Sequence, residues 1–238
     1  MDHPIRPRRV LPLTSPASLA RLLEGPVPDA ARGLLGARLV RESGGQRRTG
    51  RIVEVEAYGG PEDGASHARF GPRSRAAAMF GAAGRAYVYG VYGMHTCLNV
   101  VVGPPGRAAA ILLRSVEPLD GAAAMRAARL ARALATRRAD RADPAAAAAR
   151  IARVAESRLA AGPGNLAAAF DVGRDADGVD LLDAAGSLRL EPRPAADAPF
   201  DIVAAPRIGV AYAGPPWDAM PWRYVAVGRA APAGSAIR

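Results

Sequence analysis

Three β-rich runs follow one another with little chain between them, at residues 86–91, 94–102 and 108–114. Short turns join them, at 92–93 and at the Gly- and Pro-rich segment 103–106. Parallel strands need a crossover of about a dozen residues or more, whereas antiparallel strands can be joined by a tight turn. This spacing therefore predicts an antiparallel meander and argues against a parallel βαβ sheet.

Further strand patterns lie before and after the meander. An expected hairpin joins residues 37–42 and 51–58 through a turn at Ser43, Gly44 and Gly45. Shorter strand-like pieces follow in the last third of the chain, at 187–190, 208–212 and 223–227. Together with the meander, these runs predict a curved, mainly antiparallel sheet.

Helical patterns surround the strands. Ser15 and Pro16 are typical of an N-cap and a first helical position, and a second short helix is expected at 29–35. The Ala- and Arg-rich segment 118–161 predicts two surface helices, the second restarting at Asp143-Pro144.

The sequence contains no internal repeat and no clear linker. We therefore expect one α+β (mixed) domain over residues 15–228, with helices around the sheet. A flexible basic arm (1–14) and a flexible tail (229–238) are expected at its ends.

The charge balance favours a polyanionic partner. The 238 residues include 32 Lys plus Arg against 22 Asp plus Glu, a formal net charge of +10. Such an excess suits binding to nucleic acid, although charge alone does not establish it. The sequence has no lysine, so every basic side chain is arginine and mechanisms that need a lysine amine are excluded.

Cysteine and histidine are scarce. A single cysteine, Cys97, excludes an internal disulfide, and His3, His67 and His95 give no familiar zinc spacing. We therefore expect no metal and no cofactor. The apolar runs are too short to cross a membrane, so we expect no membrane partner. We also expect a cytoplasmic protein, associated with the nucleoid if the source is bacterial, and a monomer.

Alternation along residues 51–58 places Glu54, Glu56 and Tyr58 on one strand face. On this segment alone, a solvent-facing surface is the favoured interpretation, because glutamate is usually exposed. The functional interpretation makes one carboxylate a general base at the rim of a pocket.

Three tyrosines lie around two glycines at the start of the meander. Tyr87 and Tyr89 share a strand face, whereas Tyr92 falls at the turn and would project from the hairpin tip. They could be ordinary sheet tyrosines. They could also form a stacking platform and a wedge, because a base taken out of a duplex leaves a hole that something must occupy.

Taken together, these segments resemble the alkyladenine (3-methyladenine) DNA glycosylase family. The resemblance runs from about residue 36 to residue 228, is weakest in the Ala- and Arg-rich helices, and is highly specific in its central block. It implies a single mixed α/β domain with a curved antiparallel sheet. The matching pieces, in order, are Glu54-Val55-Glu56-Ala57-Tyr58, Gly60-Pro61-Glu62-Asp63, Ala65-Ser66-His67, Met79-Phe80-Gly81, Tyr87-Val88-Tyr89, Tyr92-Gly93-Met94, Cys97-Leu98-Asn99, Leu112-Leu113-Arg114 and Glu117-Pro118-Leu119.

The resemblance implies that Glu56 is the general base that deprotonates a water for attack on the sugar C1′, and that Arg114 orients this water. The chemistry agrees, because attack at C1′ develops positive charge on the sugar, and a carboxylate can both activate the water and stabilise that charge. Glu54, on the same strand face, is the alternative base. Arg114 could otherwise be one of many solvated arginines.

The resemblance also implies a pocket for the base. Tyr58, His67 and Tyr89 would stack on the flipped base and hydrogen-bond to it. Tyr92 would fill the vacated space in the DNA, and Asn99 would crowd the amino group of guanine. Electron-rich tyrosine faces bind cationic methylated purines well. Taken singly, His67 is more often structural and Asn99 more often a hydrogen bonder at a strand end.

The sequence departs from the family pattern at two positions. Ala76 follows Arg75 where the family commonly has an Arg-Asn pair, and Asn165 follows Gly-Pro-Gly where a basic residue is common. Both changes predict weaker contacts with the DNA backbone without touching the proposed base. His95 and Cys97 are interpreted as structural.

These observations predict a monofunctional DNA glycosylase that acts on damaged purines in double-stranded DNA and initiates base excision repair. With no lysine to form a Schiff base, it should stop at the abasic site. The main alternative is a non-catalytic nucleic-acid-binding module, which explains the arginines and tyrosines but not a glutamate beside them. A zinc-dependent base deaminase is excluded, because its His-x-Glu and Pro-Cys-x-x-Cys motifs are absent.

Overall fold

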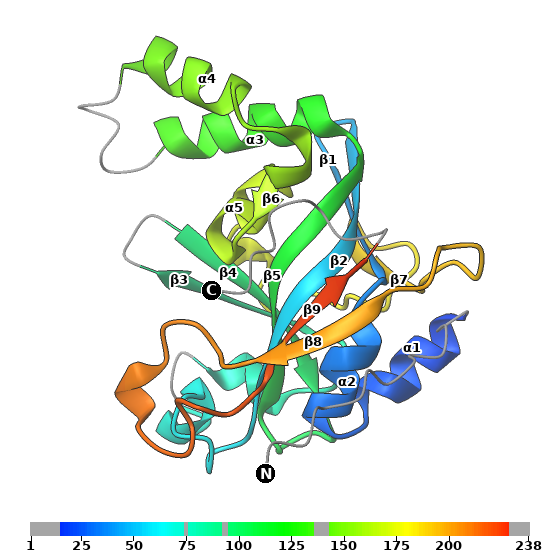
Figure 1. Cartoon of the computed structure of the whole chain (residues 1–238), viewed down its shortest axis with the longest axis vertical. Coiled ribbons are helices and arrows are strands. Elements are labelled where there is room, and N and C mark those ends of the chain that lie inside the picture. Colours follow the sequence, from blue (N-terminus) through cyan, green and yellow to red (C-terminus); the bar gives the residue numbers. More distant parts are fainter. Residues whose placement is uncertain (1–14, 74–75, 92–94, 136–142, 229–238) are drawn as a thin grey trace.

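A strongly curved sheet forms the centre of the molecule (Figure 1). Its longest strands are β2 (Gln46–Tyr58) and β5 (Ala109–Asp120), which lie next to each other. The structure, a computed structural model, describes residues 15–73, 76–91, 95–135 and 143–228. Within these residues nine strands form one sheet, the main path runs β3-β4-β5-β2-β1-β7, and every pairing between them is antiparallel. The other strands are β1 (Arg38–Ser43), β3 (Ala86–Val91), β4 (His95–Val102), β6 (Ala160–Ala161), β7 (Leu188–Glu191), β8 (Asp201–Ala205) and β9 (Arg223–Val227).

Strand β2 changes neighbour halfway along its length. Residues 46–51 pair with β1, whereas residues 54–56 pair with residues 223–225 of β9. The register between β2 and β5 shifts between Ile52 and Glu54, and such irregularities bend a strand and increase its twist. The sheet therefore divides at this point, and the glutamates of β2 lie beside β9.

Helices cover the sheet on several sides. Helix α1 begins at a capping box, in which the Ser15 hydroxyl accepts a hydrogen bond from the Ser18 N–H and the Ser18 hydroxyl interacts with the Ser15 backbone. Helices α3 and α4 lie side by side at the top of Figure 1, and α5 contacts both α3 and β4. The α-helices are α1 (Pro16–Leu23), α2 (Val27–Leu34), α3 (Ala122–Leu134), α4 (Pro144–Ala152) and α5 (Pro163–Ala169). The short 3-10 helices are η1 (His67–Phe70), η2 (Ala77–Phe80), η4 (Glu156–Arg158), η5 (Arg174–Ala176) and η6 (Ala211–Ala213).

Arginines of α3 bind backbone carbonyl groups of the neighbouring segments. Arg126 Nη1 donates to the carbonyl of Ile151, in the last turn of α4, at 2.8 Å. Arg129 and Arg132 donate in the same way to carbonyls that follow α4 and α5, each at 2.8 Å. The last carbonyls of a helix have no partner within the helix, so Arg126 supplies one at the end of α4. Together the three arginines help to fix α3 to the segments that follow α4 and α5.

The sheet separates two apolar clusters, since alternate strand residues point to opposite faces. Val88 and Val100 belong to the main core, which α1, α2 and α5 cover. Tyr87 and Val101 face the other way and pack with Met79 beside η1 and η2. This smaller cluster lies next to the cavity described below.

The expected fold class is confirmed, a mixed α+β domain with a curved antiparallel sheet. The strand expected at 208–212 is wrong, because this segment is a loop that leads into η6. Pro206 lacks the N–H that a strand ladder needs, and Gly209 has a positive φ of 77°, so neither favours a continuous strand. Strand β8, just before this loop, lies where no strand was expected.

The expected basic arm at 1–14 and tail at 229–238 lie outside the described residues. Within the part of the chain that the structure describes, no helix is long and apolar enough to cross a membrane.

Candidate active site

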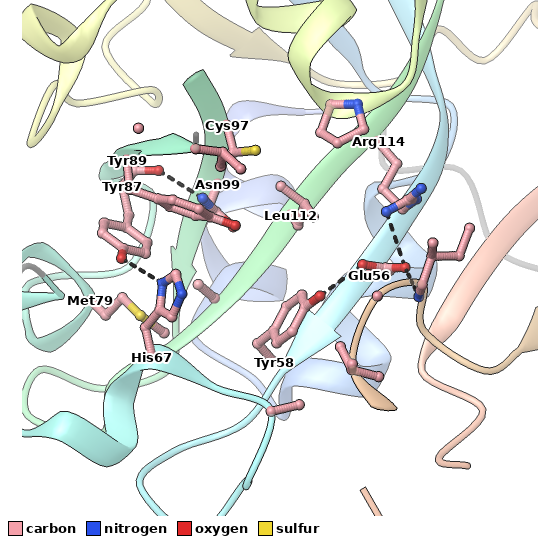
Figure 2. A pocket seen from close by; sticks show the side chains of 18 of the residues that line it. Glu56, Tyr58, His67, Met79, Tyr87, Tyr89, Cys97, Asn99, Leu112 and Arg114 are labelled. Atoms are coloured by element: carbon pink, nitrogen blue, oxygen red, sulfur yellow. Dashed lines mark hydrogen bonds and ion pairs between the residues drawn. The ribbon is translucent and has the colours of Figure 1, made fainter. Parts of the chain in front are cut away.

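A cavity of about 510 Å³ lies between strands β2 to β5 and the loops that follow β2 and β8. This volume is in the range typical of small-ligand sites. Figure 2 shows Glu56, Arg114 and Tyr58 on one side and the aromatic residues of β3 and η1 on the other, with Leu112 between them. The cavity therefore has one charged side and one aromatic side.

Glu56 lies on the charged side and is completely buried, with an exposed fraction of 0%. Its Oε1 atom is 3.2 Å from Arg114 Nη1 and accepts a hydrogen bond from the Ile208 N–H at 2.7 Å. Its Oε2 atom accepts from the Tyr58 hydroxyl at 2.8 Å. An ionised carboxylate offers about four acceptor positions, so these three donors leave roughly one position for a further donor.

Glu54 holds the other side of Arg114. Its Oε1 atom accepts from Arg114 Nε at 3.0 Å and from Arg223 Nη1 at 3.2 Å, and its Oε2 accepts from the Ser115 hydroxyl at 2.9 Å. Glu54 is not among the residues that line the cavity, whereas Glu56 and Arg114 are. Burial alone would lower the pKa of Arg114, but the negative charges of Glu56 and Glu54 outweigh it and raise that pKa.

A solvent-facing surface, the favoured interpretation of the segment alone, is therefore wrong for these glutamates. Glu54 is 8% exposed and Glu56 is 0% exposed, because β9 and the loop after β8 cover this part of β2. Arg114 is likewise no solvated arginine, since its side chain is 12% exposed and lies between the two carboxylates.

Tyr58 is the third residue of this side and also lines the cavity. Burial, and then the negative charge of Glu56 and the hydrogen bond to it, raise the pKa of Tyr58 well above its ordinary value. The phenol therefore stays protonated and donates to Glu56. The guanidinium of Arg207 lies 4.8 Å from the centre of the Tyr58 ring.

The aromatic side combines β3 with η1. The rings of His67 and Tyr89 meet edge to face, with centroids 4.6 Å apart, and those of Tyr87 and Tyr89 lie 5.3 Å apart. The Nδ1 atom of His67 shares a hydrogen bond of 2.9 Å with the Tyr87 hydroxyl. Burial raises the pKa of Tyr89, and contact with Cys97 adds to this shift, so that this side of the cavity carries a neutral phenol.

Asn99 and Cys97 lie two residues apart on β4 and both line the cavity. The Asn99 side chain is 3% exposed, and its Nδ2 donates to the Tyr87 carbonyl at 2.9 Å, which fixes the orientation of the amide. Cys97, interpreted from the sequence as structural, is buried at the cavity wall, and burial raises the pKa of its thiol. Strand alternation from Asn99 was the signal that could have placed Cys97 here.

Two further groups of lining residues escaped sequence reasoning. Tyr87 was grouped with Tyr89 by strand face, but its contact with His67 joins segments 20 residues apart. Ile208 and Tyr212 come from the loop that was expected to be a strand. Tyr92, the expected wedge, lies outside the described residues, although its neighbour Val91 lines the cavity.

The two departures from the family pattern have structural partners. Ala76 is 0% exposed and packs in the smaller apolar cluster with Met79. Asn165 accepts a hydrogen bond from Arg129 Nη2 at 3.0 Å and donates to the Ala161 carbonyl at 2.8 Å. His95 lies at the start of β4, with its ring against Gly164, and does not line the cavity.

Neither a metal nor a cofactor was expected from the sequence. Among the described residues, no group of three or more His, Cys, Asp or Glu side chains is arranged to hold a metal ion.

The sequence matches known proteins over most of its length. The family profile described as "Methylpurine-DNA glycosylase (MPG)" matches residues 21–230. A protein named "Putative 3-methyladenine DNA glycosylase" in Anaeromyxobacter dehalogenans (strain 2CP-C) is 43% identical over 202 residues, which cover 84% of this chain and 78% of that protein. Proteins of the same name in Methanocella arvoryzae and Bacillus cereus (strain B4264) are 41% and 37% identical, over 84% of this chain and 86% and 91% of their own lengths. The chain therefore belongs to the methylpurine-DNA glycosylase family.

Proposed function

We propose that this protein is a monofunctional DNA glycosylase that flips alkylated or deaminated purines out of duplex DNA and hydrolyses the bond between base and sugar. The observation that carries the proposal is the fully buried carboxylate of Glu56, on the wall of a cavity whose opposite side is aromatic. A module that only binds nucleic acid gains nothing from a carboxylate there, because it repels phosphate.

In the proposed reaction, a water bound to the free acceptor position of Glu56 attacks C1′ of the sugar. The new bond forms between the water oxygen and C1′ while the bond from C1′ to the base nitrogen breaks, and its electron pair leaves with the base. The water proton passes to Glu56. A methylated purine leaves as a neutral base, because its positive charge takes up that electron pair.

Arg114 has two effects on this step. Its Nη1 atom, 3.2 Å from Glu56 Oε1, holds the carboxylate in one orientation. Its positive charge is balanced by Glu54, so Glu56 keeps enough negative character to stabilise the cationic sugar as the base departs. The Tyr58 hydroxyl donates a hydrogen bond to the other carboxylate oxygen, Oε2, and so helps to orient it.

The aromatic side would receive the base. Tyr89 and Tyr58 offer electron-rich faces from opposite sides of the cavity, which suits a purine that carries positive charge. The anchored Asn99 amide narrows the cavity beside Tyr87 and would reject guanine by crowding its exocyclic amino group.

Excision assays on defined lesions test this proposal. Purified protein is incubated with duplexes that each carry one 3-methyladenine, hypoxanthine or etheno-adenine, and abasic sites are then revealed by alkaline cleavage. We expect product from at least one lesion and far less from the undamaged duplex. If no lesion yields product although the protein binds the duplexes, the binding-module alternative replaces the proposal.

The monofunctional character has its own test. The chain has no lysine, so we expect borohydride to trap no covalent protein-DNA adduct and strand breaks to appear only after alkali. A trapped adduct from nuclease-free protein would contradict attack by water and would direct attention to the α-amino group of Met1.

A further inference from the structure

Behind the Glu56 side of the cavity, Arg207 and Asp63 form an ion pair with side chains that are both 0% exposed. Arg207 Nη1 lies 2.6 Å from Asp63 Oδ2, and Nη2 lies 3.0 Å from Oδ1, so the contact is bidentate. Neither residue lines the cavity. Buried ion pairs are often no more stabilising than apolar residues of the same volume, so a gain in stability alone is a weak explanation for this one.

The pair joins two segments that are distant in sequence, the end of β2 with the loop that follows it and the loop that follows β8. Arg207 also donates to the carbonyl of Ala57, at the end of β2, and to that of Trp217, each within 3.1 Å. Asp63 accepts from two backbone N–H groups of its own loop, at 2.9 and 3.0 Å. Figure 1 shows the segment after β8, in orange, beside the segment after β2, in cyan. The pair therefore fixes both loops to the end of β2.

Arg207 is linked to the carboxylate of Glu56 in two ways. Arg207 directly precedes Ile208, whose N–H donates to Oε1 of Glu56 at 2.7 Å. The Arg207 guanidinium also lies 4.8 Å from the Tyr58 ring centre, and the Tyr58 hydroxyl donates to Oε2 of Glu56. Of the three donors to Glu56, Arg207 therefore positions two, the Ile208 N–H and the Tyr58 hydroxyl.

The ion pair is one of several contacts that hold the loop after β8. Ile208 is 51% exposed and Tyr212 is 60% exposed, so neither is anchored by burial, whereas Val210 is 3% exposed. The Tyr212 hydroxyl does donate to the Ala65 carbonyl at 3.0 Å, but that bond holds the loop farther along. Arg223 Nε also donates to the Pro206 carbonyl at 3.0 Å, but the bidentate ion pair is made by the residue that directly precedes the N–H facing Glu56.

We propose that the Asp63–Arg207 pair is a positioning element for the reaction, which holds the Ile208 N–H and the Tyr58 hydroxyl against the two oxygens of Glu56. The inference rests on the function proposed above. Arg207 touches neither water nor substrate and acts through its neighbours. Loss of the pair should leave a cavity that still binds the base, but a carboxylate that is less well oriented.

The test compares Arg207→Lys and Asp63→Asn with the wild-type protein. Lysine keeps the charge but cannot bridge the aspartate and two carbonyls with one planar group. We expect the single-turnover rate on the duplex whose lesion the wild type excises fastest to fall about 10- to 100-fold, since misplacement by roughly 1 Å can cost 10²-fold. The duplex concentration at half-maximal rate should change less than about threefold, because uniform binding is retained.

Arg193→Lys is the matched control. Arg193 is also buried, lies 4.6 Å from the ring centre of Phe200 and donates from Nη2 to the carbonyls of Asp197 and Ala198. It is not among the cavity residues. We expect this variant to lose thermal stability as Arg207→Lys does and to keep the wild-type rate.

Several outcomes would overturn the inference. One is a wild-type single-turnover rate in Arg207→Lys. Another is an unchanged maximal rate with a rise only in the duplex concentration at half-maximal rate. If Arg207→Lys does not fold, the isosteric Asp63→Asn variant replaces it in the test. A wild-type rate in Asp63→Asn would then overturn the inference. A wild-type protein that excises no base overturns the proposed function itself, whereas an active wild type beside fully active variants overturns only the positioning role.

Discussion

The two sides of the cavity are held in place by different forces. On the side of β2 and β5, Glu56 and Arg114 belong to a chain of ion pairs that continues to Glu54 and Arg223. On the side of β3 and η1, His67, Tyr87 and Tyr89 meet through ring contacts and the hydrogen bond between His67 and Tyr87.

This difference implies different tolerance to displacement. A buried charge is costly unless it is paired, so removal of one member of the ionic chain leaves another without compensation. Ring contacts contribute only about 0.5–1.5 kcal/mol each beyond burial, and rings can adjust to one another. The ionic side is therefore suited to chemistry at one fixed atom, and the aromatic side to bases that differ in shape.

Removal of the charge at Glu56 should have the largest effect. In Glu56→Gln the amide oxygen can still accept from Arg114 and Ile208, and the pocket keeps its shape, but the amide cannot take the proton from water. We expect excision to fall about 10²- to 10⁴-fold and lesion binding to stay close to that of the wild type. Single-turnover excision and fluorescence binding with the same duplex measure the two quantities.

Loss of a stacking surface on the aromatic side should come second. Tyr89→Leu removes the ring that contacts both His67 and Tyr87, and stacking of a base on an aromatic ring is worth about 1–3 kcal/mol. We expect lesion affinity to fall about 5- to 150-fold, with a smaller change in the maximal rate. Tyr89→Phe, which keeps the ring, is the control, and an equal loss in that variant would assign the effect to the hydroxyl.

Glu54→Gln should have an intermediate effect, because it acts on Arg114 and not on the water. The variant loses the charge that balances Arg114 and Arg223 while Glu56 remains. We expect a loss of about tenfold in the single-turnover rate, the size of a modest misorientation. A loss as large as that in Glu56→Gln would make Glu54 the general base in place of Glu56.

Asn99→Ser should have the smallest effect on rate and act on selectivity. The shorter side chain no longer reaches the Tyr87 carbonyl and leaves space for the exocyclic amino group of guanine. We expect release of guanine from undamaged DNA to rise about 2- to 13-fold over that of the wild type, the size of one hydrogen bond. Release no greater than that of the wild type would place guanine exclusion elsewhere in the cavity.

The sequence predicted those parts of the molecule that depend on local pattern. Alternation brought Glu56 and Tyr58 to one strand face, and their hydrogen bond agrees with it. The tight turns of the meander predicted the antiparallel order of β3, β4 and β5. The family resemblance identified the chain correctly, and the roles assigned to individual residues stay predictions.

Contacts across long sequence distances were not predictable in this way. Arg207 and Asp63 are 144 residues apart, and without the fold each is one more charged residue in a loop. Ile208 and Val210 alternate with small residues and so suggested a strand, yet here they line the cavity. The covering of Glu54 by β9 likewise depends on where the sheet divides, which no local pattern reveals.

Because arginines of α3 bind backbone carbonyl groups, the net charge of the protein overstates the number of cations that can contact DNA phosphates. Salt weakens DNA binding in proportion to the number of phosphates that a protein neutralises. A guanidinium such as that of Arg126, which donates to the end of α4, is engaged in helix packing, and the buried Arg207 and Arg223 are engaged in the interior. The slope of log affinity against log salt concentration should therefore correspond to far fewer cations than the 32 basic residues in the sequence. A chain with every arginine replaced by lysine would keep its charge and lose much of the planar hydrogen bonding that joins its helices.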